Sequence, residues 1–409
     1  MDDGQRRRLR GALAVGALAL VVAAAAVDLV VLASSNSRPP PGAPIAGTTA
    51  TAAAPPPPAQ QPGLPAPAAE VFGVSVNRLF NDASYTPAQL SAQLASVRAT
   101  GATVARTDAL WEATEPLAPV DGHHHYNWAF DDAIARALAE HDLTWLPIID
   151  YTAPYNQSIP GQDHSPPLSD VDYADYAAAF AGRYGPGGSF WSANPDLTPR
   201  PVTAMEIWNE PDNAQFWLPG PDPGAYADLY LTARAAIQRV DPSMRVLIGG
   251  LVDPATFLPA MVRARPLIRG HVDGVAIHPY GSPGVVLAKV RAARATLVSL
   301  GMGSVPLYVT EFGWTVSPPG APDYAPSTVR DGYITQTLDD LGHLSCGLAA
   351  AVLYTWVTPE VDPRNAQDWY GIADPSGAGG PTPATRAFAA GLEAAAGPPP
   401  ADAPAPCPG

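Results

Sequence analysis

The sequence predicts an α/β fold in which eight parallel strands and eight helices close into a single (β/α)8 TIM barrel. Short β-rich segments alternate with amphipathic segments eight times between residues 70 and 396, and this alternation is typical of a parallel barrel. Two amphipathic segments begin with a capping residue followed by proline, at Thr86-Pro87 and Asp222-Pro223, as helix N-termini often do. No Gly-x-Gly-x-x-Gly follows the first predicted strand, which argues against a doubly wound open sheet.

The predicted strands are short runs rich in β-branched and apolar residues. We expect strands at 71–76, 103–106, 144–149, 204–208, 246–249, 274–277, 307–310 and 350–354. We expect helices at 87–100, 128–141, 172–184, 223–240, 255–269, 284–300, 327–344 and 383–395. Active-site residues of such a barrel lie where the strands end and the following loops begin, so the strand ends are the places to look for chemistry.

The two ends of the chain differ in composition from the barrel segment at 70–396. Within residues 1–33, four arginines precede a long apolar run, which fits either a cleaved signal peptide or a transmembrane anchor. We favour the anchor because no Ala-x-Ala cleavage site stands out, and either reading places the following domain outside the cytoplasm. Residues 34–69 are rich in proline and alanine and predict a disordered linker, and 397–409 predict a similar disordered tail.

Charge and cysteine content exclude several classes of function. The formal net charge is −15, which argues against nucleic acid as a partner because phosphate binding needs clustered Lys and Arg. Cys346 and Cys407 are the two cysteines; they could pair or stay free, since sequence does not give their separation. The run at 123–125 is three histidines, which we interpret as a polar loop tip because no carboxylate spacing completes a metal site. We expect no metal and no cofactor.

Glutamates follow the fourth and the seventh predicted strands. Asn209-Glu210-Pro211 comes directly after the strand at 204–208, and Glu311-Phe312-Gly313-Trp314 after the strand at 307–310. Strands four and seven face each other across the mouth of an eight-stranded barrel, so both carboxyl groups are expected at its rim. Cleavage of a glycosidic bond by the common mechanism requires such a pair, one protonated and one ionised.

Trp208-Asn209-Glu210-Pro211 resembles the Asn-Glu-Pro motif of the clan A glycoside hydrolases. The resemblance implies that Glu210 is the catalytic acid/base and Glu311 the nucleophile of a retaining glycosidase. It also implies that Asn209 donates a hydrogen bond to the sugar 2-hydroxyl group.

Other strand ends carry the same resemblance. His278-Pro279-Tyr280 is similar to the His-x-Tyr of cellulase-like members, in which the Tyr contacts the nucleophile and the His lines the site. Arg106 resembles the arginine that supports the nucleophile, and Trp356 the tryptophan beneath the sugar. Asp150 departs from the pattern, because many cellulase-like members carry a histidine there. The xylosidase-like and exopolysaccharide-hydrolase-like families of the clan therefore match about equally well.

The remaining aromatic and acidic residues have simpler interpretations. Tryptophan can stack on a sugar ring or pack in a core. We expect Trp314 to join Trp356 at the substrate, leave both readings open for Trp111 and Trp217, and assign Trp145 and Trp208 to packing. We interpret Glu206 as structural, facing the barrel interior and paired with an arginine.

These observations predict a monomeric retaining glycoside hydrolase that acts on an extracellular polysaccharide or glycoside. Its location would be the cell membrane, with the catalytic domain outside, or the medium. A carbohydrate-binding barrel without activity is an alternative, although the presence of both glutamates argues against it. A transglycosylase with the same two carboxylates is another, and the sequence does not separate it from a hydrolase.

Overall fold

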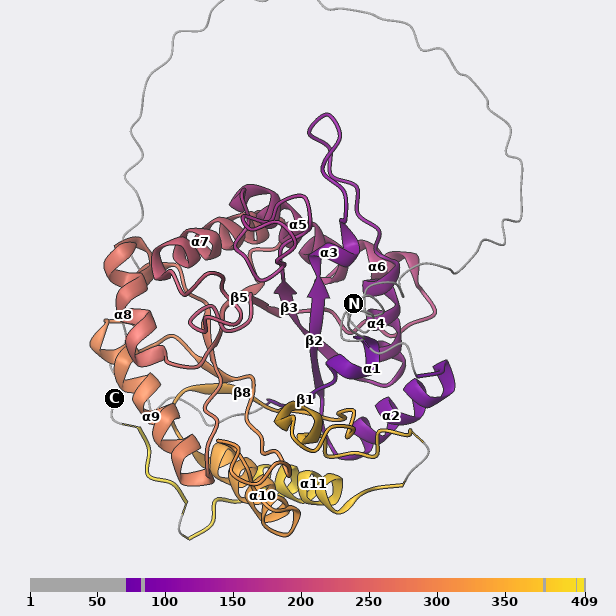
Figure 1. Cartoon of the computed structure of the whole chain (residues 1–409), viewed down its shortest axis with the longest axis vertical. Coiled ribbons are helices and arrows are strands. Elements are labelled where there is room, and N and C mark those ends of the chain that lie inside the picture. The colour runs from indigo at the N-terminus through magenta and orange to yellow at the C-terminus, as the bar shows by residue number, and fades with distance from the viewer. Residues whose placement is uncertain (1–70, 82–84, 378–379, 402, 408–409) are drawn as a thin grey trace, which may run out of the picture. The chain divides into compact units, whose positions relative to one another are not determined.

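The computed structural model confirms the closed barrel of eight parallel strands (Figure 1). It describes residues 71–81, 85–377, 380–401 and 403–407. Neighbouring strands pair in chain order, and β8 closes the sheet against β1. The strands are β1 (Val71–Ser75), β2 (Val104–Leu110), β3 (Thr144–Asp150), β4 (Ala204–Ile207), β5 (Arg245–Leu251), β6 (Gly274–Ile277), β7 (Leu307–Val309) and β8 (Leu348–Leu353).

Each of the eight predicted helices has a counterpart in the structure. The helices are α1 (Asn77–Asn81), α2 (Pro87–Ala99), α3 (Trp111–Thr114), α4 (Ala129–Glu140), α5 (Asp170–Tyr184), α6 (Ser189–Ala193), α7 (Pro223–Val240), α8 (Pro254–Ala264), α9 (Pro283–Ser299), α10 (Ser327–His343) and α11 (Pro383–Ala395), with 3-10 helices η1 (Pro266–Gly270) and η2 (Ala366–Trp369). The predicted helix at 255–269 divides into α8 and η1, because Pro266 lacks the N–H that would continue the helix. The pattern missed α1, α3 and α6, which are too short to show a helical period.

The expected N-terminal segments lie outside the described residues. This holds for the targeting segment at 1–33 and for the linker at 34–69. No helix in the described part of the chain combines the length and the apolar character that a bilayer crossing requires.

Helix starts follow the capping signals in the sequence. Thr86 accepts a hydrogen bond from the backbone N–H of Gln89, and the Gln89 side chain accepts one from the N–H of Thr86. Asp222 accepts from the backbone N–H groups of Gly224 and Ala225. Such caps satisfy amide groups that have no partner within the helix, and each contributes about 1 kcal/mol.

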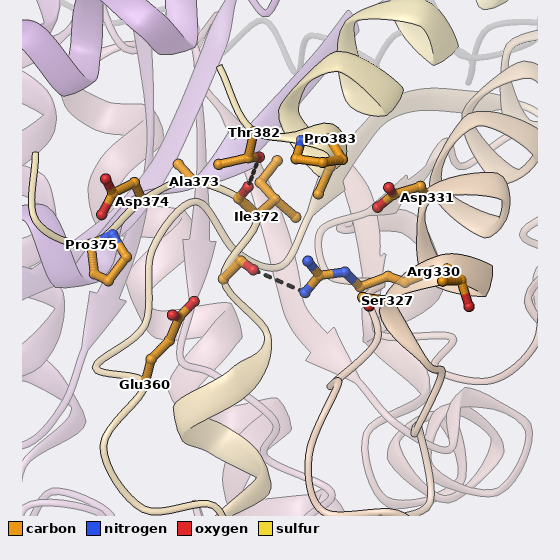
Figure 2. Close-up of a pocket in the computed structure, with 13 residues that line it drawn as sticks. Ser327, Arg330, Asp331, Glu360, Ile372, Ala373, Asp374, Pro375, Thr382 and Pro383 are labelled. Atoms are coloured by element: carbon orange, nitrogen blue, oxygen red, sulfur yellow. Dashed lines mark hydrogen bonds between the residues drawn. The ribbon is translucent and has the colours of Figure 1, made fainter. Parts of the chain in front are cut away.

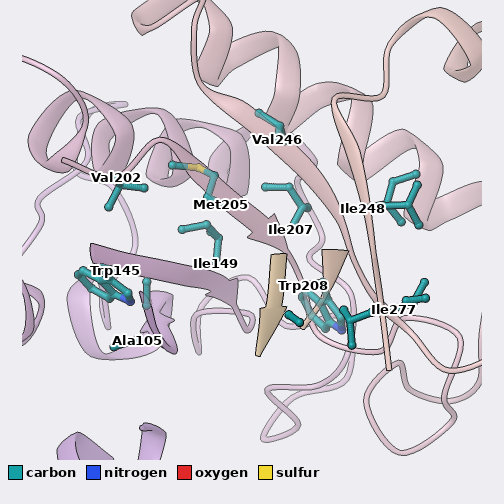
Figure 3. Packing of buried hydrophobic residues seen from close by; sticks show 14 of the residues in the cluster. Ala105, Trp145, Ile149, Val202, Met205, Ile207, Trp208, Val246, Ile248 and Ile277 are labelled. Carbon is teal, nitrogen blue, oxygen red and sulfur yellow. The ribbon is translucent and has the colours of Figure 1, made fainter. Parts of the chain in front are cut away.

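Strand alternation divides the apolar residues between two clusters. Leu146, Leu247, Ala276, Tyr308, Ala350 and Val352 form a small cluster of their own. A much larger cluster joins strand residues such as Ile149, Met205 and Ile207 to the surrounding helices, and Figure 3 shows part of it. Successive strand residues point to opposite faces. Arg106 pairs in register with the inward-facing Leu146, so its side chain points into the barrel.

The C-terminal tail is fixed by a disulfide bond. Cys346 and Cys407 are bonded, with their Cα atoms 4.9 Å apart. The backbone N–H of Cys407 donates to the Ser345 carbonyl at 3.0 Å, and the Arg291 guanidinium donates to the Ala405 carbonyl at 2.6 Å. The composition predicted a disordered tail at 397–409, whereas the described residues of this segment are held by these contacts.

Removing this crosslink is expected to destabilise the protein. The two cysteines are 61 residues apart, and a crosslink of that span restricts the unfolded chain, typically contributing about 2–4 kcal/mol. We expect Cys407→Ser to lower the melting temperature by several degrees, and dithiothreitol to lower that of the parent to the same value. If the melting temperature of Cys407→Ser equals that of the non-reduced parent, the crosslink does not stabilise the fold.

Candidate active site

The end of β4 has an unusual backbone that directs Glu210. Trp208 and Glu210 have φ angles of 67° and 46°, a left-handed conformation that is uncommon in residues other than glycine. Trp208 is fully buried, its ring contacts Trp217, and its indole N–H donates to the Phe216 carbonyl at 2.6 Å. Packing therefore holds a backbone that costs free energy by itself, as is common at functional sites.

Arg106 connects three of the predicted residues inside the barrel. Its Nη1 donates to Glu311 Oε1 at 2.6 Å and its Nε to Glu206 Oε1 at 2.7 Å. Its Nη2 donates to Asn209 Oδ1 at 3.1 Å. The guanidinium is 1% exposed, so these interactions are shielded from water. The prediction that Glu206 pairs with an arginine in the barrel interior is confirmed.

Glu311 is surrounded by groups that favour its ionised form. Besides Arg106, the Tyr280 hydroxyl donates to Glu311 Oε2 at 2.6 Å. Burial alone would raise the pKa of Glu311, but the positive charges of His278 and Arg106, with the hydrogen bonds from Tyr280 and Arg106, outweigh it and hold the pKa below its usual value. Glu311 is therefore a carboxylate at neutral pH.

His278 lies between the two glutamates. Its Nδ1 is 2.8 Å from Glu210 Oε1 and 3.6 Å from Glu311 Oε2. Burial lowers the pKa of His278, but the charge of Glu311 and the hydrogen bond to Glu210 raise it above its usual value. The second oxygen of Glu210 accepts from Asn213 Nδ2 at 2.7 Å. Both oxygens of Glu210 are thus oriented by donors.

The histidine ring fits because β5 has a glycine beside it. A Cβ atom on Gly250 would lie 1.9 Å from His278 Nε2, far inside van der Waals contact. Any larger residue would therefore push the imidazole away from Glu210. Sequence patterns gave no signal for this role of Gly250.

The two carboxyl groups are close to each other. Atoms of Glu210, His278 and Glu311 lie within 4.8 Å of one another. Such a triad can resemble a metal site, yet both oxygens of Glu311 already accept hydrogen bonds from Arg106 and Tyr280. Cationic and neutral donors at a carboxylate favour proton and nucleophile chemistry over ligation of a cation.

The two predicted substrate tryptophans lie elsewhere. Trp356 is 1% exposed, and its indole N–H donates to Gln93 of α2 at 2.7 Å, so the prediction that it lies beneath the sugar is wrong. Trp314 is 2% exposed and donates to the Gly281 carbonyl at 2.8 Å, which places it in the wall behind the site. Tyr354, directly after β8, faces the site instead, because its ring meets the ring of Tyr280 edge-on with the centroids 6.3 Å apart.

The four other tryptophans considered in the sequence are packing residues. Trp111 and Trp217, for which both readings were open, are buried. The indole N–H of Trp111 donates to Glu115 at 2.9 Å, and the ring of Trp217 contacts Tyr226 edge-on. The assignment of Trp145 and Trp208 to packing is confirmed by their burial in the larger cluster.

Two aspartates at neighbouring strand ends were not predicted as site residues. Asp108 near the end of β2 accepts from two amide side chains, those of Asn77 and Asn81. Asp150 at the end of β3 is fully buried, and neither of its carboxyl oxygens has a hydrogen-bond partner among the described residues. Burial, with the negative charge of Asp108, raises the pKa of Asp150 well above its usual value.

This buried acid predicts a stability that depends on pH. Because the folded state holds a proton on Asp150 that the unfolded chain releases above about pH 4, stability is lost as pH rises from there through the folded pKa. Asp150→Asn keeps the shape and removes the titration. We expect equal stability near pH 4 and a variant more stable by about 1 kcal/mol or more at pH 8, since each pKa unit is worth about 1.4 kcal/mol.

Urea unfolding of the parent and of Asp150→Asn between pH 4 and pH 9 would measure this difference. Both proteins share every other titrating group, so the pH dependence of the difference belongs to Asp150. A difference that stays constant over this range would contradict a buried, protonated Asp150.

The described residues line two cavities of similar size. One, of about 570 Å³, is lined among others by Asp108 near the end of β2 and by Tyr354 after β8. The other, of about 540 Å³, lies beside α10 and α11, where Arg330 donates to the Gly371 carbonyl at 2.9 Å (Figure 2). Neither Glu210 nor Glu311 lines either cavity, but the first includes Tyr354, whose ring contacts the Glu311 partner Tyr280.

Comparison with known proteins gives matches to structures only. No protein-family model and no curated protein sequence matches the chain. Among solved structures, a monomeric β-xylosidase from Caulobacter crescentus CB15 has 21% sequence identity and a TM-score of 0.59, covering 79% of this chain and 68% of that one. A GH39 enzyme from Xanthomonas axonopodis pv. citri has 19% identity and the same TM-score of 0.59, covering 79% and 66%.

A further match is a fungal β-1,4-galactanase, with 15% identity, a TM-score of 0.52 and coverage of 78% of this chain and 99% of that one. At these identities the matches show a common fold. The three solved structures are clan A glycoside hydrolases with an eight-stranded parallel barrel. The described domain therefore has the barrel fold of the clan A glycoside hydrolases, the group whose motifs its sequence resembles.

Proposed function

We propose that this protein is a retaining glycoside hydrolase, with Glu311 as the nucleophile and Glu210 as the acid/base. One observation carries the proposal: carboxyl oxygens of the two residues lie within 4.8 Å of each other. Retaining glycosidases hold their carboxyl groups about 5–5.5 Å apart, whereas inverting enzymes need about 6.5–9.5 Å to admit a water molecule. The separation here leaves no room for that water and favours direct attack.

In the first step Glu311 attacks the anomeric carbon, forming a bond to one carboxylate oxygen while the bond to the leaving oxygen breaks. Glu210 gives its proton to that leaving oxygen. Arg106 and Tyr280 fix the attacking carboxylate from two directions. Positioning of this kind lowers the barrier because little reorganisation is needed at the moment of reaction.

In the second step the charge of Glu311 is neutralised by the ester bond. Glu210, now ionised, takes a proton from water, and the resulting hydroxide displaces Glu311 from the sugar. Asn209 supports both steps in this proposal. Because its Oδ1 accepts from Arg106, its amide is oriented, and the Nδ2 group can donate to the sugar 2-hydroxyl, as the family resemblance implies.

The test is the stereochemistry of the product. The protein, with its Cys346–Cys407 disulfide intact, would be screened against aryl β-glycosides and polysaccharides, and the first-formed sugar followed by proton NMR before mutarotation. We expect the β-anomer. The α-anomer would overturn the two-step mechanism, and sugar binding without turnover would favour the inactive carbohydrate-binding barrel. Transfer to an added sugar acceptor in preference to water would favour a transglycosylase.

We also propose that the enzyme is a monomer that works outside the cytoplasm on a polysaccharide or glycoside, attached to the membrane by residues 1–33. The arginines and the apolar run of that segment support this location, and a solved neighbour is described as a monomeric β-xylosidase. Cell fractionation of the tagged full chain would test it. Recovery from the medium instead of the membrane fraction would overturn the attachment.

A further inference from the structure

A cavity on the β1, β2 and β8 side of the barrel has the position expected for one end of the substrate. Its volume is about 570 Å³, and it is lined by Asp108 of β2 and by residues that follow β1 and β8, among them Asn77, Tyr354 and Gln367. Glu210 follows β4, which lies four strands away from β8 around the closed barrel. Since Glu210 would protonate the leaving group, the leaving group lies toward β4, and the sugar that Glu311 attacks lies toward this cavity.

Two contacts connect the cavity to Glu311. The ring of Tyr354 meets the ring of Tyr280 edge-on, with the centroids 6.3 Å apart, and Tyr280 donates to Glu311 at 2.6 Å. Asp108 lies two residues after Arg106 on β2 and so on the same face of the strand, and Arg106 donates to Glu311 at 2.6 Å. A sugar ring bound here would therefore lie next to the side chains that hold Glu311 in place.

Asp108 is presented as a fixed acceptor. Asn77 and Asn81 are four residues apart on α1, which places both amides on one face of the helix. Asn77 Nδ2 donates to Asp108 Oδ1 at 2.7 Å, and Asn81 Nδ2 donates to Oδ2 at 2.8 Å. A carboxylate has about four acceptor positions. Each oxygen of Asp108 therefore keeps acceptor capacity for a ligand hydroxyl.

Tyr354 supplies an apolar wall to the same cavity. Its hydroxyl donates to Gln367 Oε1 at 3.3 Å, and its ring contacts Tyr370, so two neighbours fix its orientation. An aromatic ring of this kind packs on the apolar face of a sugar. A flat aromatic wall and an oriented carboxylate together suit a pyranose ring with hydroxyl groups along its edge.

We propose that this cavity binds the sugar attacked by Glu311, and that Asp108 selects a neutral sugar with two adjacent free hydroxyl groups. One hydroxyl donates to each carboxylate oxygen. The inference rests on the proposed glycosidase function and adds the class of sugar to it. A site built to bond two hydroxyls rejects a sugar that lacks one, because an acceptor is then left unpaired.

The experiment compares complete and deoxygenated substrates. 4-Nitrophenyl β-D-xyloside and β-D-glucoside would be assayed beside their 3-deoxy and 4-deoxy analogues. We expect the parent to lose roughly 10²-fold or more in kcat/KM on a deoxy analogue. In Asp108→Asn we expect a similar loss on the complete sugar and discrimination against the deoxy sugar reduced to within about tenfold.

Two further variants separate recognition from folding. Asn81→Ala changes an exposed residue and frees one oxygen of Asp108, so it is expected to reduce the discrimination partly, by about tenfold. Asp362→Asn is the matched control, because Asp362 is a carboxylate of the loop after β8 that pairs with Arg364; it should behave as the parent does. Melting temperatures of all variants would show that each is folded.

Binding of the same glycosides to Glu311→Gln, with and without Asp108→Asn, completes the test. Hydrolysis by the parent with discrimination unchanged in Asp108→Asn overturns the role of Asp108 and leaves the proposed function standing. Binding that depends on Asp108 in a protein that hydrolyses none of the glycosides supports the cavity and overturns the proposed function.

Discussion

Glu311→Gln is expected to lower kcat on any hydrolysed aryl β-glycoside by roughly 10⁴-fold or more, because the amide cannot form the covalent intermediate. The substitution is nearly isosteric, and the amide oxygen can still accept from Arg106 or Tyr280, which now hold Glu311 at 2.6 Å each. The fold should therefore survive. Steady-state rates, together with mass spectrometry of the parent trapped with a 2-fluoro glycoside, would locate the bond on Glu311.

Glu140→Gln is the matched control for this change. Glu140 ends α4, is exposed, and lies 3.5 Å from Arg136 on the same helix, so the same substitution there should leave kcat within about twofold of the parent, as for most surface changes. If Glu311→Gln keeps more than about a tenth of the parent rate, Glu311 is not the nucleophile.

The parent should also show the ionisation of Glu311 in its pH profile. The pKa of Glu311 lies below its usual value because His278, Arg106 and the hydrogen bonds outweigh burial. Since the nucleophile must be charged, kcat/KM is lost as pH falls through that pKa. The acidic limb of the kcat/KM profile should therefore have its midpoint below the usual pKa range of glutamate. Tyr280→Phe removes one hydrogen bond to Glu311 and should move this midpoint to higher pH.

Glu210→Ala is expected to show a rate loss that depends on the leaving group. A 2,4-dinitrophenyl glycoside leaves without protonation, so the first step should be within about tenfold of the parent, whereas an alkyl glycoside should lose about 10⁴-fold, the upper range for general acid catalysis. Added azide should replace water in the second step, accelerate turnover of the dinitrophenyl glycoside and give a β-glycosyl azide.

A single-turnover measurement would separate the two steps. If Glu210→Ala slows the dinitrophenyl and the alkyl glycoside by equal factors, Glu210 is not the proton donor. Asn213→Ala removes one hydrogen bond to Glu210 and keeps the carboxyl group. The rate loss of Asn213→Ala should be smaller, about tenfold, and added azide should not change the turnover rate of this variant.

Much of the fold follows from local sequence. The alternation of strands and helices, and caps such as Thr86 and Asp222, depend on neighbours within a few residues, so the pattern located every barrel strand within a few residues. Strand-end position also predicted that Arg106, Glu210, His278 and Glu311 meet, since parallel strands bring their carboxyl ends to one rim. The structure brings these four side chains together.

The remaining features depend on contacts between residues that are distant in sequence. Trp356 follows the end of β8, where alternation no longer fixes direction, and its direction is set by Gln93, 263 residues away. The pairing of Cys346 with Cys407 and the space that Gly250 leaves for His278 are likewise decided by distances between separate segments. Local patterns thus determine which elements form and which strand ends carry polar groups. Burial, partner choice and charge at Asp108 and Asp150 arise only when the barrel closes, because low dielectric and packing are properties of the assembled interior.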